Sequence, residues 1–514
     1  MNSVQIAPLS GIKLVLATLA LGMGSFMNIL DLTIVNVAVP TMAGDFAVSP
    51  TQGTWIITSY SVAEAIMLPL AGFLAGRFGE VRSFVAATLL FTLASLLCAA
   101  SISFPMLLAA RVLQGVFGAS MIPLSQTLLT AIYPPHKRGL ALGIWAMTTV
   151  IAPIAGPLAG GWLTDNASWH WIFLVNLPVG LLVGISVAVM LSHRDALQPG
   201  KRDQQMDWIG LSLLIVGIGS LQILLDKGNE LDWFSSGTII TLAVIAVLAL
   251  LMFVVWELDA DYPLVDLRLF ARRNFLVGAV CLMLGMMAFF GVVVIIPLWL
   301  QTFQGYTSLW AGKSVAFGGV LAVILGPVIG ANIGRVDARA VTTFGFIVFA
   351  LVGFWSARFT PDIDYWSIAI SRLYMGIGIS CFFLPLITIG LSGLPAESIA
   401  AASGLSNFMR NLGASFGTAI TTWLWTSKAS EYHARLVENI QPYNPVANDY
   451  LKQLHQLGMP GDAAYAYLEN IINIQAYTMA TDQILKISAT LMLSLVLLIW
   501  WAKPPFVASR GGAH

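Results

Sequence analysis

Residues 139–162 read GLALGIWAMTTVIAPIAGPLAGGW and decide the fold class. The stretch carries no charge over 24 residues, which is long enough for a helix to cross a bilayer. Small residues and prolines recur in it at intervals of four: Gly139 and Gly143, Gly156 and Gly160, Pro153 and Pro157. Because residues four apart share a helix face, one face has almost no side chains and another carries two prolines. Such a helix is unfavourable in water, but in a membrane the small face admits a second helix and the prolines bend the span.

The composition agrees with a membrane protein. Of the 514 residues, 58% are hydrophobic and 10% are charged, whereas about 25% are charged in soluble domains. The formal net charge of zero gives no reason to expect a nucleic-acid partner. Cys98, Cys281 and Cys381 each lie in an apolar run, and the histidines are scattered, so we expect neither a disulfide framework nor a metal site. The sequence predicts an all-α polytopic membrane protein.

Fourteen apolar segments are long enough to span a membrane. Their approximate limits are 13–39, 53–75, 83–102, 106–131, 140–163, 171–191, 208–225, 237–256, 275–301, 311–333, 341–357, 366–391, 400–426 and 484–502. Loops that follow even-numbered segments carry most of the lysines and arginines, whereas the short loops after odd-numbered segments are nearly bare of them. The positive-inside rule therefore predicts that both termini are cytoplasmic.

The two ends of the chain repeat each other. Pro40 matches Pro297 at an offset of 257, and a further set of residues matches at offsets of 258 and 261: Pro69 with Pro327, Gly72 with Gly330, Gly76 with Gly334, Arg77 with Arg335, Arg111 with Arg372 and Gly115 with Gly376. Two similar six-helix halves around a central site are typical of transporters. We expect an N-terminal half at 1–195, an inserted helix pair at 196–274 and a C-terminal half at 275–514.

One predicted external loop, 427–483, is much longer than the others. Leu451, Leu454 and Leu457 recur at helical spacing, and a second stripe follows: Tyr465, Leu468 and Ile472. The pattern predicts two short amphipathic helices lying on the external face. We expect them to dock a partner or to gate a cavity rather than to serve as a spacer.

Two charged residues are expected at the same depth of the membrane. Asp31 lies nine residues before Pro40 in the first span, which is about 13 Å along a helix. An acid at this depth is costly and usually marks an ion or proton path, although an acid at a helix end could also reach water. Arg111 lies in the fourth span at a similar depth, and it stays protonated. Arg111 either pairs with the acid or binds a backbone carbonyl.

Further polar residues are expected around a central cavity. Glu64 in the second span is a second proton site, a contact for cationic substrates, or a buried neutral acid. The second half has no acid matching Asp31 or Glu64, but it offers Arg372 and Arg410. The predicted cavity residues are Asn36, Gln114, Gln126, Arg372 and Arg410. Such a cavity would suit weakly acidic as well as cationic compounds.

Several of these strings resemble the motifs of one family, the fourteen-span drug:proton antiporters of the major facilitator superfamily. They are the first-span string 30–40, Arg111-Val-Leu-Gln-Gly115 and Pro153-Ile-Ala-Gly-Pro-Leu-Ala-Gly-Gly161. The resemblance implies a major facilitator fold with two inserted helices, and proton coupling by Asp31, Arg111 and Glu64. It also implies a conformational motif made of Gly72, Gly76, Arg77, Glu80, Arg82, Pro153, Gly156, Pro157, Gly160 and Gly161. Gly76 departs from the family pattern, which commonly has an aspartate there.

The resemblance further implies export of hydrophobic or amphipathic drugs and toxins across a bacterial inner membrane, driven by the proton gradient without a cofactor. Partners would be a periplasmic adaptor of the membrane-fusion class and a TolC-like outer-membrane channel. An alternative is a narrow-specificity exporter of a single metabolite, fatty acid or siderophore. An enzyme is not expected, because Gly312-Lys-Ser314 lacks the first glycine of a phosphate loop. The nucleophile-elbow string Gly413-Ala-Ser-Phe-Gly417 lies within a predicted span instead of at a strand-to-helix turn.

Overall fold

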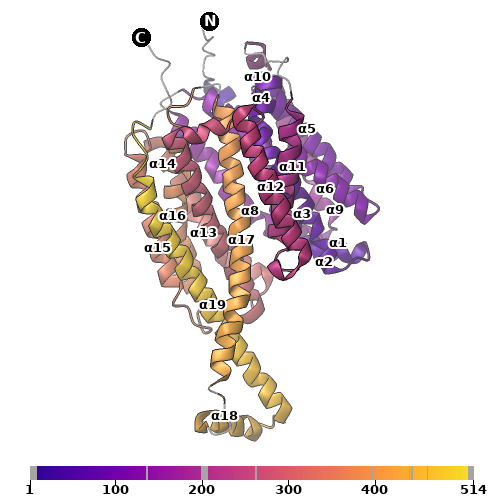
Figure 1. Cartoon of the computed structure of the whole chain (residues 1–514), viewed down its shortest axis with the longest axis vertical. Helices are drawn as coiled ribbons and strands as arrows, with labels where there is room; N and C mark the ends of the chain where they lie inside the picture. Colours follow the sequence, from indigo (N-terminus) through magenta and orange to yellow (C-terminus); the bar gives the residue numbers. More distant parts are fainter. Residues whose placement is uncertain are drawn as a thin grey trace.

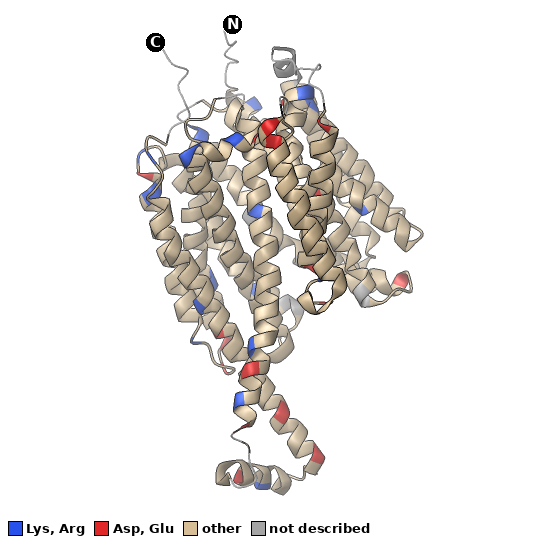
Figure 2. Ribbon diagram, viewed as in Figure 1, with Lys and Arg blue, Asp and Glu red and all other residues tan. Residues whose placement is uncertain are grey.

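The computed structural model describes residues 9–134, 137–197, 206–260, 263–395, 398–438, 440, 444–459 and 461–506. Within these ranges every regular element is a helix, which confirms the all-α class. The helices stand side by side in a long bundle, with both ends of the chain at one end of it (Figure 1). Lysines and arginines gather at that same end (Figure 2).

Every predicted segment of the first half coincides with a helix or a consecutive helix pair. The elements are α1 Gly11–Asp45, α2 Pro50–Gly53, α3 Trp55–Met67, η1 Leu68–Leu70, α4 Ala71–Phe78, α5 Glu80–Ala99, α6 Phe104–Gly118, α7 Met121–Ile132, α8 Arg138–Asn166, α9 His170–Leu174 and α10 Asn176–Leu197. The second span is interrupted at η1, which contains Pro69. A proline removes one backbone hydrogen bond and clashes with the preceding turn, so the chain changes helix type there.

The remaining predicted segments also coincide with helices. The inserted pair is α11 Trp208–Lys227 and α12 Gly237–Asp259, with η3 Trp233–Ser235 between them and η4 Leu267–Ala271 after them. The second half contains α13 Arg273–Phe303, α14 Ser308–Asn332, α15 Ala338–Ser356, α16 Tyr365–Leu391, α17 Ile399–Val437, α18 Pro445–Gln456 and α19 Gly461–Ile499.

Most of these helices are long and apolar enough to cross a membrane. In the described ranges twelve qualify, and thirteen do if the bent helix α8 is counted as one span. Helix α8 bends by 42° between Pro153 and Leu158, where the sequence predicts a bend. Helix α17 stands at the thirteenth predicted position, and it is too polar to qualify by composition. Its polar side chains face neighbouring helices, as described below for Asn407 and Arg410.

The long external loop differs from the prediction of two short helices lying on the bundle. Only the first stripe forms a separate helix, α18. The second stripe is the start of α19, a continuous helix of 39 residues, because no glycine or proline follows Gly461 to interrupt it. The end of α17, the whole of α18 and the start of α19 project from the bundle as a stem (Figure 1). Residues 425–483 are called the stem below.

Polar side chains hold the two long helices of the stem together. Trp425 donates to Thr481 Oγ1 at 2.9 Å, and Tyr432 donates to Gln483 Oε1 at 2.7 Å. Farther out, His433 Nε2 lies 2.9 Å from Glu469 Oε1. The stem therefore extends the paired helices of the bundle beyond it and does not fold back over the bundle.

Candidate functional site

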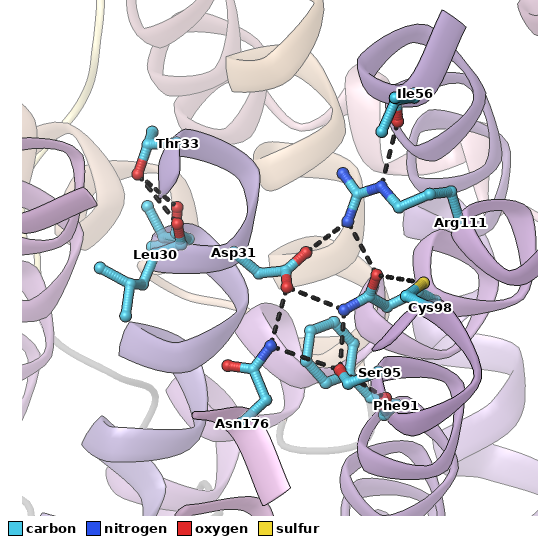
Figure 3. Close-up of polar contacts among 11 residues, drawn as sticks. Leu30, Asp31, Thr33, Ile56, Phe91, Ser95, Cys98, Arg111 and Asn176 are labelled. Carbon is cyan, nitrogen blue, oxygen red and sulfur yellow. Dashed lines mark hydrogen bonds and ion pairs between the residues drawn. The ribbon is translucent and has the colours of Figure 1, made fainter. Parts of the chain in front are cut away.

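Asp31 and Arg111 form a fully buried ion pair between α1 and α6 (Figure 3). Arg111 Nη1 donates to Asp31 Oδ2 at 2.6 Å, and both side chains have no exposed surface. The other carboxylate oxygen, Oδ1, accepts from Gln114 Nε2 and from Asn176 Nδ2, each at 2.8 Å. The two residues expected at the same depth are thus in direct contact, and the carboxylate is bonded on both oxygens.

Arg111 also binds a backbone carbonyl, so the two alternatives considered for it occur together. Its Nε donates to the carbonyl of Ile56 at 3.0 Å, and its Nη1 donates to Gln114 Oε1 at 2.7 Å. The guanidinium carbon lies 4.3 Å from the centre of the Tyr60 ring. These contacts hold the guanidinium against α3 and α6.

Gln114 belongs to the ion-pair network and not to an open cavity. Besides Asp31 it donates to Ser95 Oγ at 2.8 Å, and Asn176 also reaches Ser95 at 3.3 Å. Ser95, Asn176 and Tyr60 are not among the site residues predicted from the sequence. The signal for Asn176 is a lone amide in an apolar segment, which must find a partner when it is buried. Together these side chains form a neutral polar cage around one carboxylate.

Binding of a proton to Asp31 would remove the negative charge that faces Arg111 in the buried pair. Breaking such a pair by neutralising one partner leaves the other charge uncompensated, at a cost of about 3–5 kcal/mol. A proton on Asp31 would leave Arg111 with its charge balanced only by Gln114 and the Ile56 carbonyl. The arrangement therefore offers a place to hold one proton, with a large energetic consequence for the surrounding helices. In the described ranges no group of three or more metal-ligating side chains occurs.

Glu64 lies apart from this pair, at the boundary between the two halves. It is buried in α3, and Arg410 of α17 in the other half is close enough to interact with it electrostatically. An acid of the first half and a base of the second therefore interact across the boundary between the halves. Asn28 and Tyr60 are buried beside Glu64.

The other predicted cavity residues have different surroundings. Gln126 is buried and accepts from Asn407 Nδ2 at 3.1 Å, which joins α7 of the first half to α17 of the second. Asn36 is exposed on α1. Among the described residues, Arg372 is 2% exposed and its hydrogen-bond partners are neutral groups of its own half. A cavity lined by the five residues stays a prediction.

Glycines of the conformational motif mark close helix contacts between the halves. A Cβ on Gly72 would lie 2.5 Å from Ala401 Cα of α17. Gly139 and Gly143 of α8 are packed against the backbone of Gly330 and Gly326 of α14. At these glycines the two halves are in direct backbone contact.

Two other glycine seams lie within one half each. Gly156 and Gly160 pack against Thr33 and Ile34 of α1. Gly413 and Gly417 of α17 pack against the backbone of α13. The repeat explains this, because equivalent helices make equivalent contacts inside each half. Gly161 is different, since an added Cβ there would meet only Val37, at 3.8 Å.

The rest of the motif lies around the turn between α4 and α5. Gly79 ends α4 with φ +94°, a conformation that favours glycine. The Arg77 guanidinium lies 5.9 Å from the Phe73 ring and 5.6 Å from the Phe78 ring. Gly76 lies in α4, and Glu80 and Arg82 begin α5. Pro153 is half-buried at the bend of α8, and the side chain of Pro157 lies outside the described part.

The inserted helix α11 contacts both halves. Lys227 Nζ donates to Thr54 Oγ1 of the first half at 2.7 Å. On the second half, Gln222 donates to Ser415 Oγ at 3.0 Å, and Asn229 donates to the carbonyl of Ala419 at 3.2 Å. Helix α11 therefore lies between α3 and α17 and links the two halves.

Comparisons with known proteins agree with this geometry. A family model described as Major Facilitator Superfamily matches residues 21–418. The Multidrug export protein EmrB of Escherichia coli K12 is 47% identical over 509 residues, which cover 99% of each chain. The Fatty acid resistance protein FarB of Neisseria gonorrhoeae is 44% identical over 507 residues, again with 99% of each chain covered.

Solved structures of low sequence identity share the fold. The human organic anion transporter MFSD10 superposes with a TM-score of 0.60 at 13% identity, over 95% of this chain and 100% of that one. The proton:xylose symporter XylE gives a TM-score of 0.56 at 14% identity, over 94% and 96% of the two chains. The chain therefore belongs to the major facilitator superfamily, whose members are transporters and not enzymes, and over 99% of its length it is similar to multidrug exporters of the EmrB type.

Proposed function

We propose that the chain is a proton-coupled antiporter that exports hydrophobic or amphipathic drugs and toxins from the cytoplasm across the bacterial inner membrane. The observation that supports it best is the Asp31–Arg111 pair, in which a carboxylate with no exposed surface has one cation and otherwise neutral partners. Ionisable side chains at membrane depth that pair with an opposite charge and with polar neutral groups usually serve ion or proton transport.

In the proposed cycle the proton and the substrate exclude one another. With Asp31 ionised, its carboxylate holds α1 to α6 through Arg111. A proton bound to Asp31 weakens this link, while Arg111 keeps its bonds to Gln114 and the Ile56 carbonyl. The first half would then repack against the second, opening the contacts of Gly139 and Gly143 with α14. Release of the proton to the cytoplasm restores the pair.

The substrates proposed are hydrophobic compounds of either charge. Relatives are named for multidrug export, and one is named for fatty acid resistance, which keeps a narrower exporter of fatty acids as the second candidate. The side chains of Glu64 and Arg410 suit both, because the carboxylate of Glu64 attracts cations and the guanidinium of Arg410 attracts carboxylates. A multidrug exporter would move both ethidium and decanoate, whereas the narrower exporter would move decanoate alone.

Transport by purified protein in liposomes tests the proposal. Uptake of ethidium and decanoate is measured with and without an imposed pH gradient, for the unmodified chain and for Asp31→Asn. We expect Asp31→Asn to abolish gradient-driven transport while keeping the fold, since asparagine preserves the shape and part of the hydrogen bonding. Asp362→Asn, in an exposed loop, is the matched control. Uphill transport by Asp31→Asn would exclude Asp31 as the proton site.

We further propose that the chain works in a tripartite system with an EmrA-like periplasmic adaptor and a TolC-like outer-membrane channel. Basic residues at the terminal end of the bundle favour a cytoplasmic location for that end, which directs the stem to the periplasm (Figure 2). Helix α18 exposes Val446 and Leu457, at 76% and 77%. Apolar side chains so far from the bundle are favourable where a partner covers them.

Replacement of the α18 segment tests the role of the stem. Residues 445–459 are exchanged for a Gly/Ser linker that leaves the paired ends of α17 and α19 in place. We expect transport in liposomes to continue, while adaptor co-purification and drug resistance in cells fall sharply. Val446→Ser with Leu457→Ser is the milder variant. Full adaptor recovery from both variants would contradict docking through α18.

A further inference from the structure

The second half contains a copy of the ion-pair network without its acid. At an offset of 261, Ser95 corresponds to Ser356 and Arg111 to Arg372. At the same offset Gln114 is replaced by Met375. The copies lie on α15 and α16, which correspond to α5 and α6. Pro40 and Pro297, both inside helices, set an offset of 257 between α1 and α13, and this offset puts Ala288 in the place of Asp31.

Arg372 is as deeply buried as its counterpart, but its contacts are neutral. Its Nη2 donates to Ser356 Oγ at 2.6 Å, and its Nε donates to Ser371 Oγ at 3.2 Å. Its Nη1 lies 3.6 Å from Met375 Sδ, a weak acceptor. Among the described residues none supplies it with a carboxylate, whereas Arg111 has Asp31 at 2.6 Å.

A buried guanidinium with neutral partners lacks compensation for its charge. Arginine stays protonated in proteins, so it cannot escape the cost by losing its proton. Hydroxyl acceptors offset only part of the several kcal/mol lost on removing one ion from water. Three of its five N–H groups are accounted for by the bonds above. The remaining donors and the uncompensated charge both favour an anion beside it.

The surroundings of Arg372 are suited to a small anion. Ser356 Oγ accepts from Arg372, so the hydroxyl proton of Ser356 is free to donate. Ala288 is 2% exposed, and it occupies the position at which the first half provides a carboxylate group. Alanine lacks that group, so the chain itself supplies no carboxylate at this position.

We propose that Arg372, together with the Ser356 hydroxyl, binds a monovalent anion in the place that corresponds to the Asp31 carboxylate. The ligand is a halide or the carboxylate head group of an amphipathic solute, since both supply one negative charge to the guanidinium. The second half thereby obtains from solution the counter-charge that the first half carries in its own chain. This inference does not rest on proton coupling, and it can fail while the proposed antiport stands.

Thermal unfolding in detergent at constant ionic strength tests the site. Sulfate is the background salt, and chloride, acetate or decanoate replaces part of it. We expect the unmodified protein to gain at least about 2 °C in melting temperature with a bound anion, because ligands of the folded state alone stabilise it. Stabilisation by chloride and acetate alike indicates a small counter-ion. Stabilisation by decanoate alone, at low concentration, indicates a solute head group.

Two variants separate this site from general salt effects. Arg372→Met removes the charge and should lose the response to anions while keeping its stability in sulfate. Ala288→Asp supplies a built-in carboxylate, so it should raise the melting temperature in sulfate and abolish the response. A response that persists in Arg372→Met would overturn the proposal. So would an unmodified protein that does not respond to any of the three anions, a result that stands even if Ala288→Asp fails to fold.

Discussion

The two halves of the transporter place the same arginine on corresponding helices and surround it differently. Arg111 has a carboxylate bonded on both oxygens, whereas Arg372 has two hydroxyls and a thioether. Only the first arrangement includes a group that can bind or release a proton. The two arginines therefore have different roles. Arg111 pairs with a side chain that can titrate, whereas Arg372 is a fixed positive charge.

The largest expected difference follows from removing each arginine. Arg111→Met leaves Asp31 buried and unpaired, which costs about 3–5 kcal/mol and should abolish both gradient-driven transport and normal yield of folded protein. Arg372→Met removes an uncompensated charge and keeps the volume, so its stability in chloride-free buffer should be unchanged or higher. Melting temperature and transport in liposomes measure both variants. Equal losses in the two variants would show that the halves do not differ as described.

The repeated glycine seams give the next largest effect. Gly156→Leu should block transport, because the contact of α8 with α1 around Thr33 has no room for a side chain. Gly413→Leu should do the same in the second half, where the backbone of Met283 lies against α17. Gly161→Leu is the control, since an added Cβ there would meet only Val37 Cγ1, at the ordinary contact distance of 3.8 Å. Transport at the unmodified rate by Gly156→Leu would show that this seam opens freely.

Lysine substitution sharpens the comparison without removing charge. Arg111→Lys cannot bind Asp31, Gln114 and the Ile56 carbonyl at once, because a single ammonium replaces a planar fork. We expect transport to fall about tenfold or more and its pH profile to change. Arg372→Lys should keep transport within about twofold, since the second half holds no proton. Full activity and an unchanged pH profile in Arg111→Lys would mean that the fork is dispensable.

The sequence predicted the helices and the ion pair because both rest on strong local signals. Apolar length defines a span, and a charge in the middle of one must find a partner, so Asp31 and Arg111 could be matched by depth alone. Ser95 and Asn176 could not be found in this way, because a serine or amide in a span has many available partners. The course of α19 was missed, since a stripe of leucine, tyrosine and isoleucine has the same spacing in a short helix and in a long one.

The sequence also could not predict which helix each glycine contacts. A Gly-x-x-x-Gly spacing predicts close approach of a helix but does not identify it. Gly139 and Gly143 meet the other half, whereas Gly156 and Gly160 on the same helix meet α1. Helix α8 contacts α1 on both sides of its bend, because Trp145 Nε1 donates to Ser25 Oγ at 3.2 Å. The two neighbours are therefore met by different faces of the same helix.

The smallest expected effect concerns the corresponding turns before α5 and α15. Helix α5 begins after Gly79, which has no side chain to offer, but α15 begins after Asp337. Asp337 accepts from the backbone and the guanidinium of Arg339, with Nη2 to Oδ2 at 2.7 Å. The hydrogen bonds from the Arg339 side chain lower the pKa of Asp337 below its usual 3.8.

A lowered pKa in the folded state means that the ionised carboxylate stabilises the fold above the usual pKa. This stability is lost as the pH falls through the lowered value. Because Asp337 is 37% exposed, the pair should contribute no more than about 0.5 kcal/mol. Asp337→Asn keeps a good helix cap and removes the charge. Its deficit in melting temperature should be small at pH 7, should shrink as the pH falls below 3.8, and should vanish below the lowered pKa of Asp337. A deficit that does not shrink as the pH falls would assign the effect to the cap and not to the ion pair with Arg339.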